Sequence, residues 1–211
     1  VDPVVADGMR RAIDAAKEAG DTVGGAFEVI AHGVPPGLGS HVQWDRKLDG
    51  RLAQALMSIQ AIKAVGIGRG IDVGHLPGSR VHDEILVDIG RGTGTVPHVV
   101  RPTNNAGGLE GGITNGEDVR VTAWMKPIST LMKPLRSIDL TTMEEAPAAI
   151  ERSDVCAVPA AAVIGEAMVC LVLADAILEK FGADTMRAID AAARNYASTI
   201  RTRLGHATER V

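Results

Sequence analysis

The spacing of apolar and polar positions predicts a helix at the start of the chain. Asp2 and Pro3 suit an N-cap and a first helical position. Apolar side chains then recur at the spacing of one helical face, at Met9, Ile13 and Ala16. Gly20 follows as a stop signal, so we expect the first helix to end just before it.

The next segments change between the strand period and the helix period. Residues 24–32 predict a strand, whereas residues 33–39 are interrupted by Pro and Gly and predict an irregular loop. Residues 45–65 carry apolar side chains at helical spacing, so we expect one long second helix there. Residues 117–125 alternate as a strand does, with one side made by Val119, Val121 and Ala123.

Two long helices are expected at the end of the chain. Residues 156–181 are apolar on nearly every side, which predicts an almost fully buried helix that Gly182 terminates. A second helix starts near Asp184 and keeps apolar side chains at helical spacing. Long helices and antiparallel strands without βαβ alternation indicate an α+β fold. No linker or short repeat divides residues 1–211, which are expected to belong to one domain.

Composition narrows the function classes. Apolar residues make up 45% of the chain and aromatic residues only 2%, which excludes a disordered chain and predicts an aliphatic core. The net charge is −4, without the clustered cations that a nucleic-acid interface needs. The most apolar stretch, residues 157–174, approaches the length of a membrane span. Glu166 lies near its middle, so a buried core helix is the preferred interpretation.

The two cysteines are predicted to be free thiols. Cys156 and Cys170 are fourteen residues apart, which on one helix separates them by roughly 21 Å. A disulfide requires Cα atoms within about 7 Å. Free thiols suit a reducing compartment, so we expect a cytoplasmic protein.

Three segments have the chemistry of a binding site. Residues 107–116 hold five glycines, which allow backbone N–H groups to approach an anion or a flat ring, although a tight turn would use the same residues. Lys126 and the hydroxyls of Ser129 and Thr130 suit a phosphate or a ring carbonyl, or else a solvated strand end. Residues 152–154 place a cation and a carboxylate just before the long apolar helix, where a simple capping role is the alternative.

Serine and metal chemistry receive little support from the sequence. Ser40 and His41 are adjacent, whereas a nucleophile and its base must face each other. A hydrolase built on them therefore remains only a minor alternative. His82, Asp83 and Glu84 are consecutive, so their side chains diverge and do not close on one metal.

Taken together, these segments resemble the chorismate synthase family. The matching runs, in the order the family has them, are GDTVGGAFEVIAHGVPPGLGSHVQWDRKLDGRLAQALMSIQAIKAVGIG, GSRVHDE, TNNAGGLEGGITNG, KPISTL and RSDVCAVPAAAVIGEAM. The resemblance covers nearly the whole chain, from Val4 to about Tyr196, and only the later part of the family's usual length. The chain is therefore expected to be the C-terminal portion of a single chorismate synthase domain.

The resemblance implies a fold, an assembly and a cofactor. It implies long helices sandwiched between antiparallel β-sheets, a homotetramer and a cytoplasmic flavoprotein connected with NADP. It also implies a reduced FMN (FMNH2) site, with no metal, for a small phosphorylated substrate, and no nucleic-acid or membrane partner. By motif match, the FMN-binding residues are Gln60, Ala61, Gly111, Lys126, Pro127, Ile128, Ser129, Thr130 and Arg152. Asp154 matches a catalytic aspartate that manages a proton at flavin N5.

The implied reaction is the anti-1,4-elimination of phosphate from 5-enolpyruvylshikimate 3-phosphate, a lyase step of the shikimate pathway that leads to aromatic amino acids. Two departures from the family pattern bear on it. The family's two catalytic histidines and its N-terminal GESHG motif have no counterpart here, so a catalytically incomplete flavin-binding or assembly fragment is the alternative. Where the family usually reads VEIGDGF, this chain has Gly66 in place of the acid and gains Arg69.

Overall fold

A computed structural model describes the backbone of residues 2–88, 93–151 and 153–208. The helices are α1 (Pro3–Glu18), α2 (Leu48–Met57), α3 (Val158–Phe181) and α4 (Met186–Thr208). The strands are β1 (Gly25–Ala31), β2 (Ile62–Ile67), β3 (Leu86–Val87), β4 (Val99–Val100), β5 (Leu109–Glu110), β6 (Ile113–Thr114), β7 (Val119–Met125), β8 (Arg136–Asp139) and β9 (Glu144–Pro147). Short 3-10 turns are η1 (Trp44–Arg46), η2 (Gly70–His75) and η3 (Gly78–Arg80).

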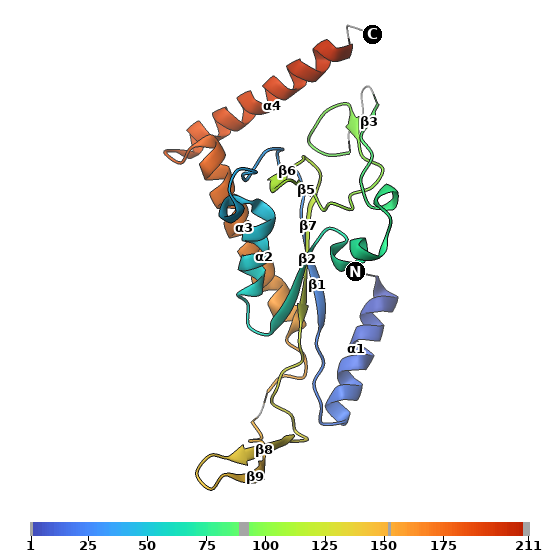
Figure 1. Ribbon diagram of the computed structural model, residues 1–211, viewed down its shortest axis with the longest axis vertical. Helices are drawn as coiled ribbons and strands as arrows, with labels where there is room; N and C mark the ends of the chain where they lie inside the picture. The colour runs from blue at the N-terminus through green and yellow to red at the C-terminus, as the bar shows by residue number, and fades with distance from the viewer. Residues whose placement is uncertain (1, 89–92, 152, 209–211) are drawn as a thin grey trace.

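A three-stranded antiparallel sheet forms the centre of the molecule. Its strand order is β1-β7-β2, so β7 pairs with both neighbours. Met125 lies opposite Gly25 on one side and opposite Ile62 on the other. Figure 1 shows α2 and α3 on one face of this sheet and α1 on the other. The mixture of helices with antiparallel sheets confirms the predicted α+β class.

Side-chain alternation explains why the sheet binds the two helices. Because successive side chains of a strand point to opposite faces, the buried residues of β7 all point toward α2 and α3: Val119, Val121, Ala123 and Met125. Leu48, Leu52 and Leu56 of α2 are completely buried against them. Burying each such leucine contributes about 1.5–3 kcal/mol. The core is aliphatic, as the low aromatic content predicts.

A glycine lets α3 approach the sheet closely. Gly165 is buried in the middle of α3, and a Cβ atom there would lie 2.4 Å from Cε2 of Phe27 in β1. Any side chain at this position would therefore push the helix off the sheet. Phe27, Gly165 and Leu56 together join β1, α3 and α2 into one core.

The prediction of one long helix over residues 45–65 is wrong. The helix α2 ends at Met57, and the chain turns at Ala61, whose φ of 66° is left-handed. The following residues, rich in the β-branched side chains Ile62, Val65 and Ile67, form the edge strand β2. Pairing with β7 determines that this segment is a strand, because the spacing of Ile62 from the earlier apolar residues fits a helix and a strand equally well.

The prediction of near-complete burial for the 156–181 helix is also wrong, although its position is confirmed as α3. One face is buried, through Ala161, Gly165, Val169, Leu173 and Ala176. On the opposite side Val163 is 68% exposed and Leu171 is 66% exposed. Among the described residues, α3 packs on β1 of the sheet, on α2 and on α4, and these contacts leave one apolar flank of this helix open to solvent.

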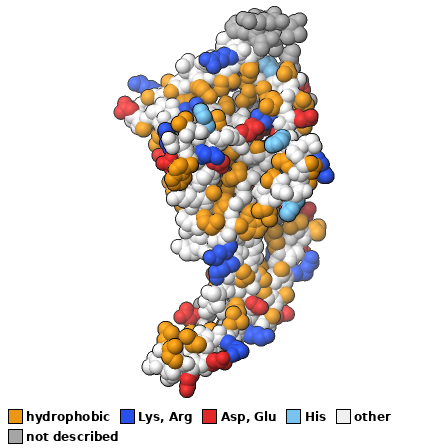
Figure 2. Space-filling view, in the orientation of Figure 1, with side chains coloured by type: hydrophobic (Ala, Val, Ile, Leu, Met, Phe, Trp, Pro, Cys, Tyr) orange, Lys and Arg blue, Asp and Glu red, His pale blue; other side chains and the backbone are white. Residues whose placement is uncertain are grey.

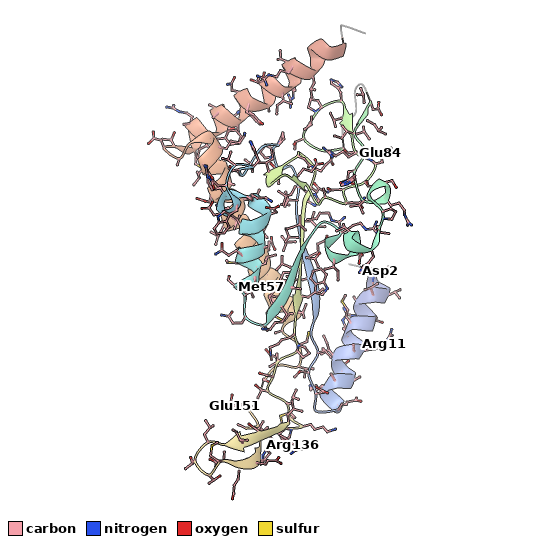
Figure 3. All side chains as sticks on the ribbon, in the orientation of Figure 1. Asp2, Arg11, Met57, Glu84, Arg136 and Glu151 are labelled. Atoms are coloured by element: carbon pink, nitrogen blue, oxygen red, sulfur yellow. The ribbon has the colours of Figure 1, made fainter. Side chains whose placement is uncertain are left out.

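Two extensions, α1 and the hairpin β8-β9, lie toward the same end of the central body in Figure 1. Asp2 caps α1 as predicted, since its Oδ1 accepts a hydrogen bond from the N–H of Val4 at 2.7 Å, but Ala16 is the buried residue of this helix. The hairpin β8-β9 projects beyond the C-terminal end of α1, where the N–H of Lys133 donates to the carbonyl oxygen of Gly20 at 3.1 Å. It carries apolar and charged side chains on an exposed surface (Figure 2). Arg136 and Glu151 mark this extension in Figure 3.

A small aromatic cluster fixes the turn between α3 and α4. The rings of Phe181 and Tyr196 meet edge to face with centroids 5.7 Å apart, and the Lys180 Nζ lies 4.1 Å from the centroid of Tyr196. The Tyr196 hydroxyl donates to the carbonyl oxygen of Pro36 at 3.1 Å. These contacts join the C-terminal helix to the irregular loop that follows β1.

Candidate functional site

Three chain segments meet at the end of the sheet where β1 starts and β7 stops. The Thr22 hydroxyl donates to the carbonyl oxygen of Ile128 at 2.6 Å. The N–H of Val23 donates to the carbonyl oxygen of Val155 at 2.9 Å. The Ser153 hydroxyl donates to the carbonyl oxygen of Thr130 at 3.1 Å. The KPIST segment and the segment that carries Asp154 are thus held next to each other.

A backbone hydrogen bond brings the Gln60–Ala61 turn to the same place. The N–H of Lys126 donates to the carbonyl oxygen of Ala61 at 2.9 Å. Ala61 adopts a left-handed conformation, and the pairing of β2 with β7 shifts register between Ile62 and Ala64. A left-handed alanine is disfavoured by about 1–2 kcal/mol, so the surrounding turn and bulge hold this residue in place. In Figure 3, Met57 marks the end of α2 that leads into this turn.

These segments line a pocket of about 320 Å3. Five of the residues predicted by motif match line it: Gln60, Ala61, Lys126, Ile128 and Ser129. The remaining wall is apolar and was not predicted; it consists of Ile59, Met125, Ala157, Ala160, Ala161 and Ile164. The signal that could have identified the α3 part is the helical spacing of positions 157, 160, 161 and 164 directly after the RSD motif.

The pocket combines apolar walls with a few polar groups at its edge. Small alanines of the first turns of α3 leave room for a flat group, and Ile164 borders it. Lys126 has no ion-pair partner among the residues that the structure describes, so its charge is available to an anion. The N-terminal end of α3 adds a partial positive charge on the same side. This arrangement suits a planar anionic ligand of the size that pockets of roughly 300–1,000 Å3 accept.

Three predicted residues lie near the pocket, and a fourth cannot be placed. Pro127 and Thr130 belong to the segment that lines it, and Asp154 is exposed in the loop that leads into α3. Arg152 lies outside the described residues. The expectation that Lys126 and Arg152 share one cleft therefore stays a prediction.

Gly111 does not join the others in this chain. It lies in the β5-β6 turn, where the carbonyl oxygen of Gly112 accepts a hydrogen bond from the N–H of Leu48 at the start of α2. Gln60 follows the other end of α2, whose ten residues span about 15 Å. An ion pair between Nη2 of Arg101 and Oε2 of Glu110, 2.8 Å apart, holds this turn in place. The glycine-rich segment and the pocket are thus at opposite ends of this helix.

Residues 65–71, which depart from the family pattern at Gly66 and Arg69, lie away from the pocket. A Cβ atom at Gly66 would lie 3.1 Å from two ring carbons of Trp124, so the indole occupies the space that a side chain would need. Arg69 lines a separate hollow of about 430 Å3 with Glu28 and Arg120. A two-pronged hydrogen bond with Glu28 raises the pKa of Arg120 above its ordinary value. The absent acid at position 66 therefore does not alter the pocket walls.

The His82-Asp83-Glu84 motif has a structural use. Asp83 accepts hydrogen bonds from the Thr103 hydroxyl at 2.6 Å and from the N–H groups of Asn105 and Ala106 at 2.8 and 2.9 Å. Burial acts to raise the pKa of Asp83, but these hydrogen bonds and the charge of Arg101 together lower it. Within residues 2–88, 93–151 and 153–208, no three His, Cys, Asp or Glu side chains gather as a metal site.

The other minor candidates are accounted for by local contacts. The Ser40 hydroxyl accepts a hydrogen bond from the N–H of Val42 at 3.2 Å and has no hydrogen bond with His41 in the described chain. Cys156 and Cys170 are free thiols, which confirms that prediction. Neither observation offers a nucleophile with its base.

Comparisons with known proteins agree with the geometry. The family model described as chorismate synthase matches residues 1–178. A chorismate synthase of Geobacter sulfurreducens is 61% identical over 189 residues, which cover 89% of this chain and 47% of that protein. One of Moorella thermoacetica is 58% identical over 202 residues, 94% of this chain and 51% of that protein.

A solved structure gives the same result. A crystal structure of chorismate synthase superposes with a TM-score of 0.75 at 45% sequence identity, over 93% of this chain and 49% of that chain. The chain therefore spans about half the length of the relatives it matches.

Proposed function

Because the chain belongs to the chorismate synthase family, we propose that it forms the flavin-binding side of the enzyme that converts 5-enolpyruvylshikimate 3-phosphate to chorismate. The observation that supports this most is the pocket shared by Gln60, Ala61, Lys126, Ile128 and Ser129. These residues come from two distant motifs, and one ligand explains why they face the same space. The protein acts in the cytoplasm, as its free thiols suggest.

The pocket residues fit reduced FMN. Met125, Ile164 and the alanines of α3 accept the faces of a flat ring system, and Gln60 and Ser129 supply hydrogen bonds at its edge. Lys126 would favour the anionic form of the ring, and Pro127 and Thr130 belong to the same segment. Arg152 is kept as a second cation of the proposed site by motif match alone. Gly111 lies at the other end of α2 from this pocket, so within one chain it does not contact a cofactor bound there. We propose that the enzyme is a homotetramer, in which another part of the assembly would bring a cofactor to Gly111.

The reaction breaks the bond between carbon and the phosphate oxygen and removes a proton, so a second double bond forms in the ring. Reduced FMN, when bound, supplies electron density during the loss of phosphate, and the reaction is redox-neutral overall. With FMN bound, Asp154 would be the residue that accepts and returns a proton at flavin N5. Lys126 stabilises negative charge near the departing phosphate, because a fixed cation in a water-poor site is worth more than in bulk water.

We propose that residues 1–211 do not by themselves complete the catalytic site. Its histidines do not match the family's catalytic ones, and His32, for example, is an exposed partner of Asp118 at 2.9 Å. Protonation of the leaving phosphate needs an acid with a pKa near neutrality, which histidine ordinarily provides. The half of the relatives that this chain does not match would provide that group.

Genetic complementation tests the proposed function. The chain is co-expressed with the unmatched half of the Geobacter sulfurreducens relative in a bacterium that lacks chorismate synthase. Growth without aromatic amino acids is expected with both pieces and not with either piece alone. Absence of growth with both pieces, when both are present at normal levels, would contradict the proposal.

A further inference from the structure

The connection between α1 and β1, residues 20–24, packs closely against the segment that follows β7. A Cβ atom at Gly24 would lie 2.3 Å from the carbonyl oxygen of Met125, so this position admits no side chain without a shift of the backbone. Further along, the N–H of Lys133 donates to the carbonyl oxygen of Gly20 at 3.1 Å. The connection and the KPIST segment therefore run beside each other.

The Thr22 hydroxyl is the group of this connection that reaches a residue of the pocket lining. It donates to the carbonyl oxygen of Ile128 at 2.6 Å in a partly buried hydrogen bond. Ile128 lines the pocket and lies between Lys126 and Ser129, which line it too. Thr22 is not a lining residue itself, so any influence it has on a ligand acts through Ile128.

This hydrogen bond fixes the peptide group that joins Ile128 to Ser129. Because a trans peptide group is planar, the N–H of Ser129 points in the direction opposite to the carbonyl of Ile128. Holding that carbonyl against Thr22 therefore directs the Ser129 N–H away from residues 20–24. In the part of the chain that the structure describes, this N–H has no hydrogen-bond partner, so it is available to a ligand.

We propose that Thr22 is a positioning residue of the candidate flavin pocket, which orients the Ser129 N–H to donate a hydrogen bond to the edge of the bound ring. The inference rests on the proposed function, because the ring is that of FMN. A flavin ring carries nitrogen and carbonyl oxygen acceptors at its edge, and hydrogen bonds to them tune the cofactor. A donor that is held in place before the ligand arrives strengthens binding, because it does not have to be ordered on binding.

The next residue of the connection contacts the segment that carries Asp154. The N–H of Val23 donates to the carbonyl oxygen of Val155 at 2.9 Å. Two consecutive residues thus hold the two sides of the proposed site, Thr22 through its side chain and Val23 through its backbone. Removal of the Thr22 hydroxyl leaves the Val23 bond in place, so it should affect FMN binding more than the placement of Asp154.

A contact that serves only the stability of the fold would show the same hydrogen bond, and Thr95 supplies the comparison. The Thr95 hydroxyl also makes partly buried hydrogen bonds to main-chain carbonyl oxygens, those of Val34 at 3.0 Å and Gly116 at 3.1 Å. Thr95 does not line the pocket. Loss of either hydroxyl should lower folding stability, and only loss of the Thr22 hydroxyl should alter FMN binding.

Three substitutions test this role by fluorescence titration of FMN into the chain, alone and paired with the unmatched half of the Geobacter sulfurreducens relative. Thr22→Val keeps the shape and removes the donor, and it is expected to weaken FMN binding about tenfold. Thr22→Ser keeps the hydroxyl and is expected to retain FMN affinity within about twofold. Thr95→Val is the matched control and is expected to leave FMN affinity unchanged. If Thr22→Val does not fold, Thr22→Cys replaces it, because a thiol is only a weak donor.

The amide NMR resonance of Ser129, recorded without flavin, measures the orientation of this N–H independently of the ligand. It is expected to move in Thr22→Val and to stay in place in Thr95→Val. When FMN is added to the unaltered chain, hydrogen exchange of the Ser129 N–H is expected to slow at least about tenfold, because the group becomes hydrogen-bonded.

Several outcomes would overturn the proposal. Unchanged FMN affinity of Thr22→Val would do so, and equal losses in Thr22→Val and Thr95→Val would show a contact that serves only stability. Loss of affinity in Thr22→Ser would show that the hydroxyl is not the group responsible. If FMN binds and the Ser129 N–H is not protected, the proposed function stands and the positioning role fails. If FMN binds to no form while the Ser129 resonance still moves in Thr22→Val, the proposed function fails and the orientation of Ser129 by Thr22 stands.

Discussion

The N–H of Lys126 donates to the carbonyl oxygen of Ala61 at 2.9 Å, which connects two motifs that are sixty-five residues apart. This hydrogen bond holds the start of β2 against the end of β7. It thereby places Gln60 in the same pocket as Lys126 and Ser129. The bond explains how a conformationally unfavourable alanine and a cation come to share one pocket. The first prediction concerns that cation.

Substitution of Lys126 by Met is expected to weaken FMN binding about tenfold, equivalent to about 1.4 kcal/mol. The charge is partly exposed, so the effect should diminish as salt is added. Fluorescence titration at low and high salt measures both effects. Lys126→Arg is the control that keeps the charge. Equal affinity of the Met variant and the unaltered chain at low salt would exclude Lys126 from the site.

Substitution of Asp154 by Ala in the reconstituted enzyme is expected to lower turnover at least about tenfold, or about 1.4 kcal/mol in the barrier. FMN affinity should change much less, because Asp154 is exposed outside the pocket lining. Chorismate formation with reduced FMN, followed anaerobically, measures this difference. Asp154→Asn keeps the shape and removes the proton acceptor, so it should be as slow as the Ala variant. Full turnover of both variants would remove Asp154 from the mechanism.

Substitution of Gly165 by Ala is expected to destabilise the fold by about 1–3 kcal/mol, because the added methyl overpacks the core. The Cβ atom would lie 2.4 Å from the Phe27 ring. Gly8→Ala in α1 is the matched control, since a Cβ there has nothing within 4 Å. That change should instead stabilise the protein by roughly 0.5–1 kcal/mol. Urea unfolding compares the two. A stabilising Gly165→Ala change would contradict the close helix–sheet contact.

Substitution of Asp83 by Asn is expected to destabilise the fold at neutral pH by about 1–3 kcal/mol, because three hydrogen bonds to a carboxylate are weakened. The folded-state pKa of Asp83 is lowered, so its ionised form stabilises the native state above the unfolded-state pKa. That stability is lost as the pH falls through the folded-state pKa.

The difference between the unaltered chain and the Asp83→Asn variant should therefore shrink on acidification below the usual aspartate pKa of about 3.9. Urea unfolding at neutral and acidic pH measures it. Thr103→Val is a control that removes one of the three donors and should have a smaller effect. A difference between the two proteins that is constant with pH would contradict the assigned role of the Asp83 carboxylate.

The sequence correctly predicted the elements whose pattern of apolar residues fits only one type of secondary structure. Val119, Val121 and Ala123 alternate strictly, and β7 lies where they are. Ile59 and Ile62 fit a helix by spacing, so the end of α2 depended on the pairing of β2 with β7, which no local pattern records. For α3, apolar residues on every side could not show which flank the rest of this chain would cover.

The same limit applies to the site. Gln60 and Lys126 could be identified from their motifs, and their proximity depends on a hydrogen bond between distant segments. Gly111 stands in an equally distinctive motif, yet α2 separates it from the pocket. Ala160 and Ile164 carry no motif chemistry of their own, so only the folded chain identifies them as pocket walls.

The most direct test of the proposed function is chorismate formation in vitro. The purified chain is assayed anaerobically with reduced FMN and 5-enolpyruvylshikimate 3-phosphate, alone and together with the unmatched half of the Geobacter sulfurreducens relative. We predict no chorismate from the chain alone and sustained formation from the pair, with phosphate released in equal amount. Sustained chorismate formation by the lone chain would contradict the incomplete-site account. A pair that binds reduced FMN but releases no phosphate would contradict the assigned reaction.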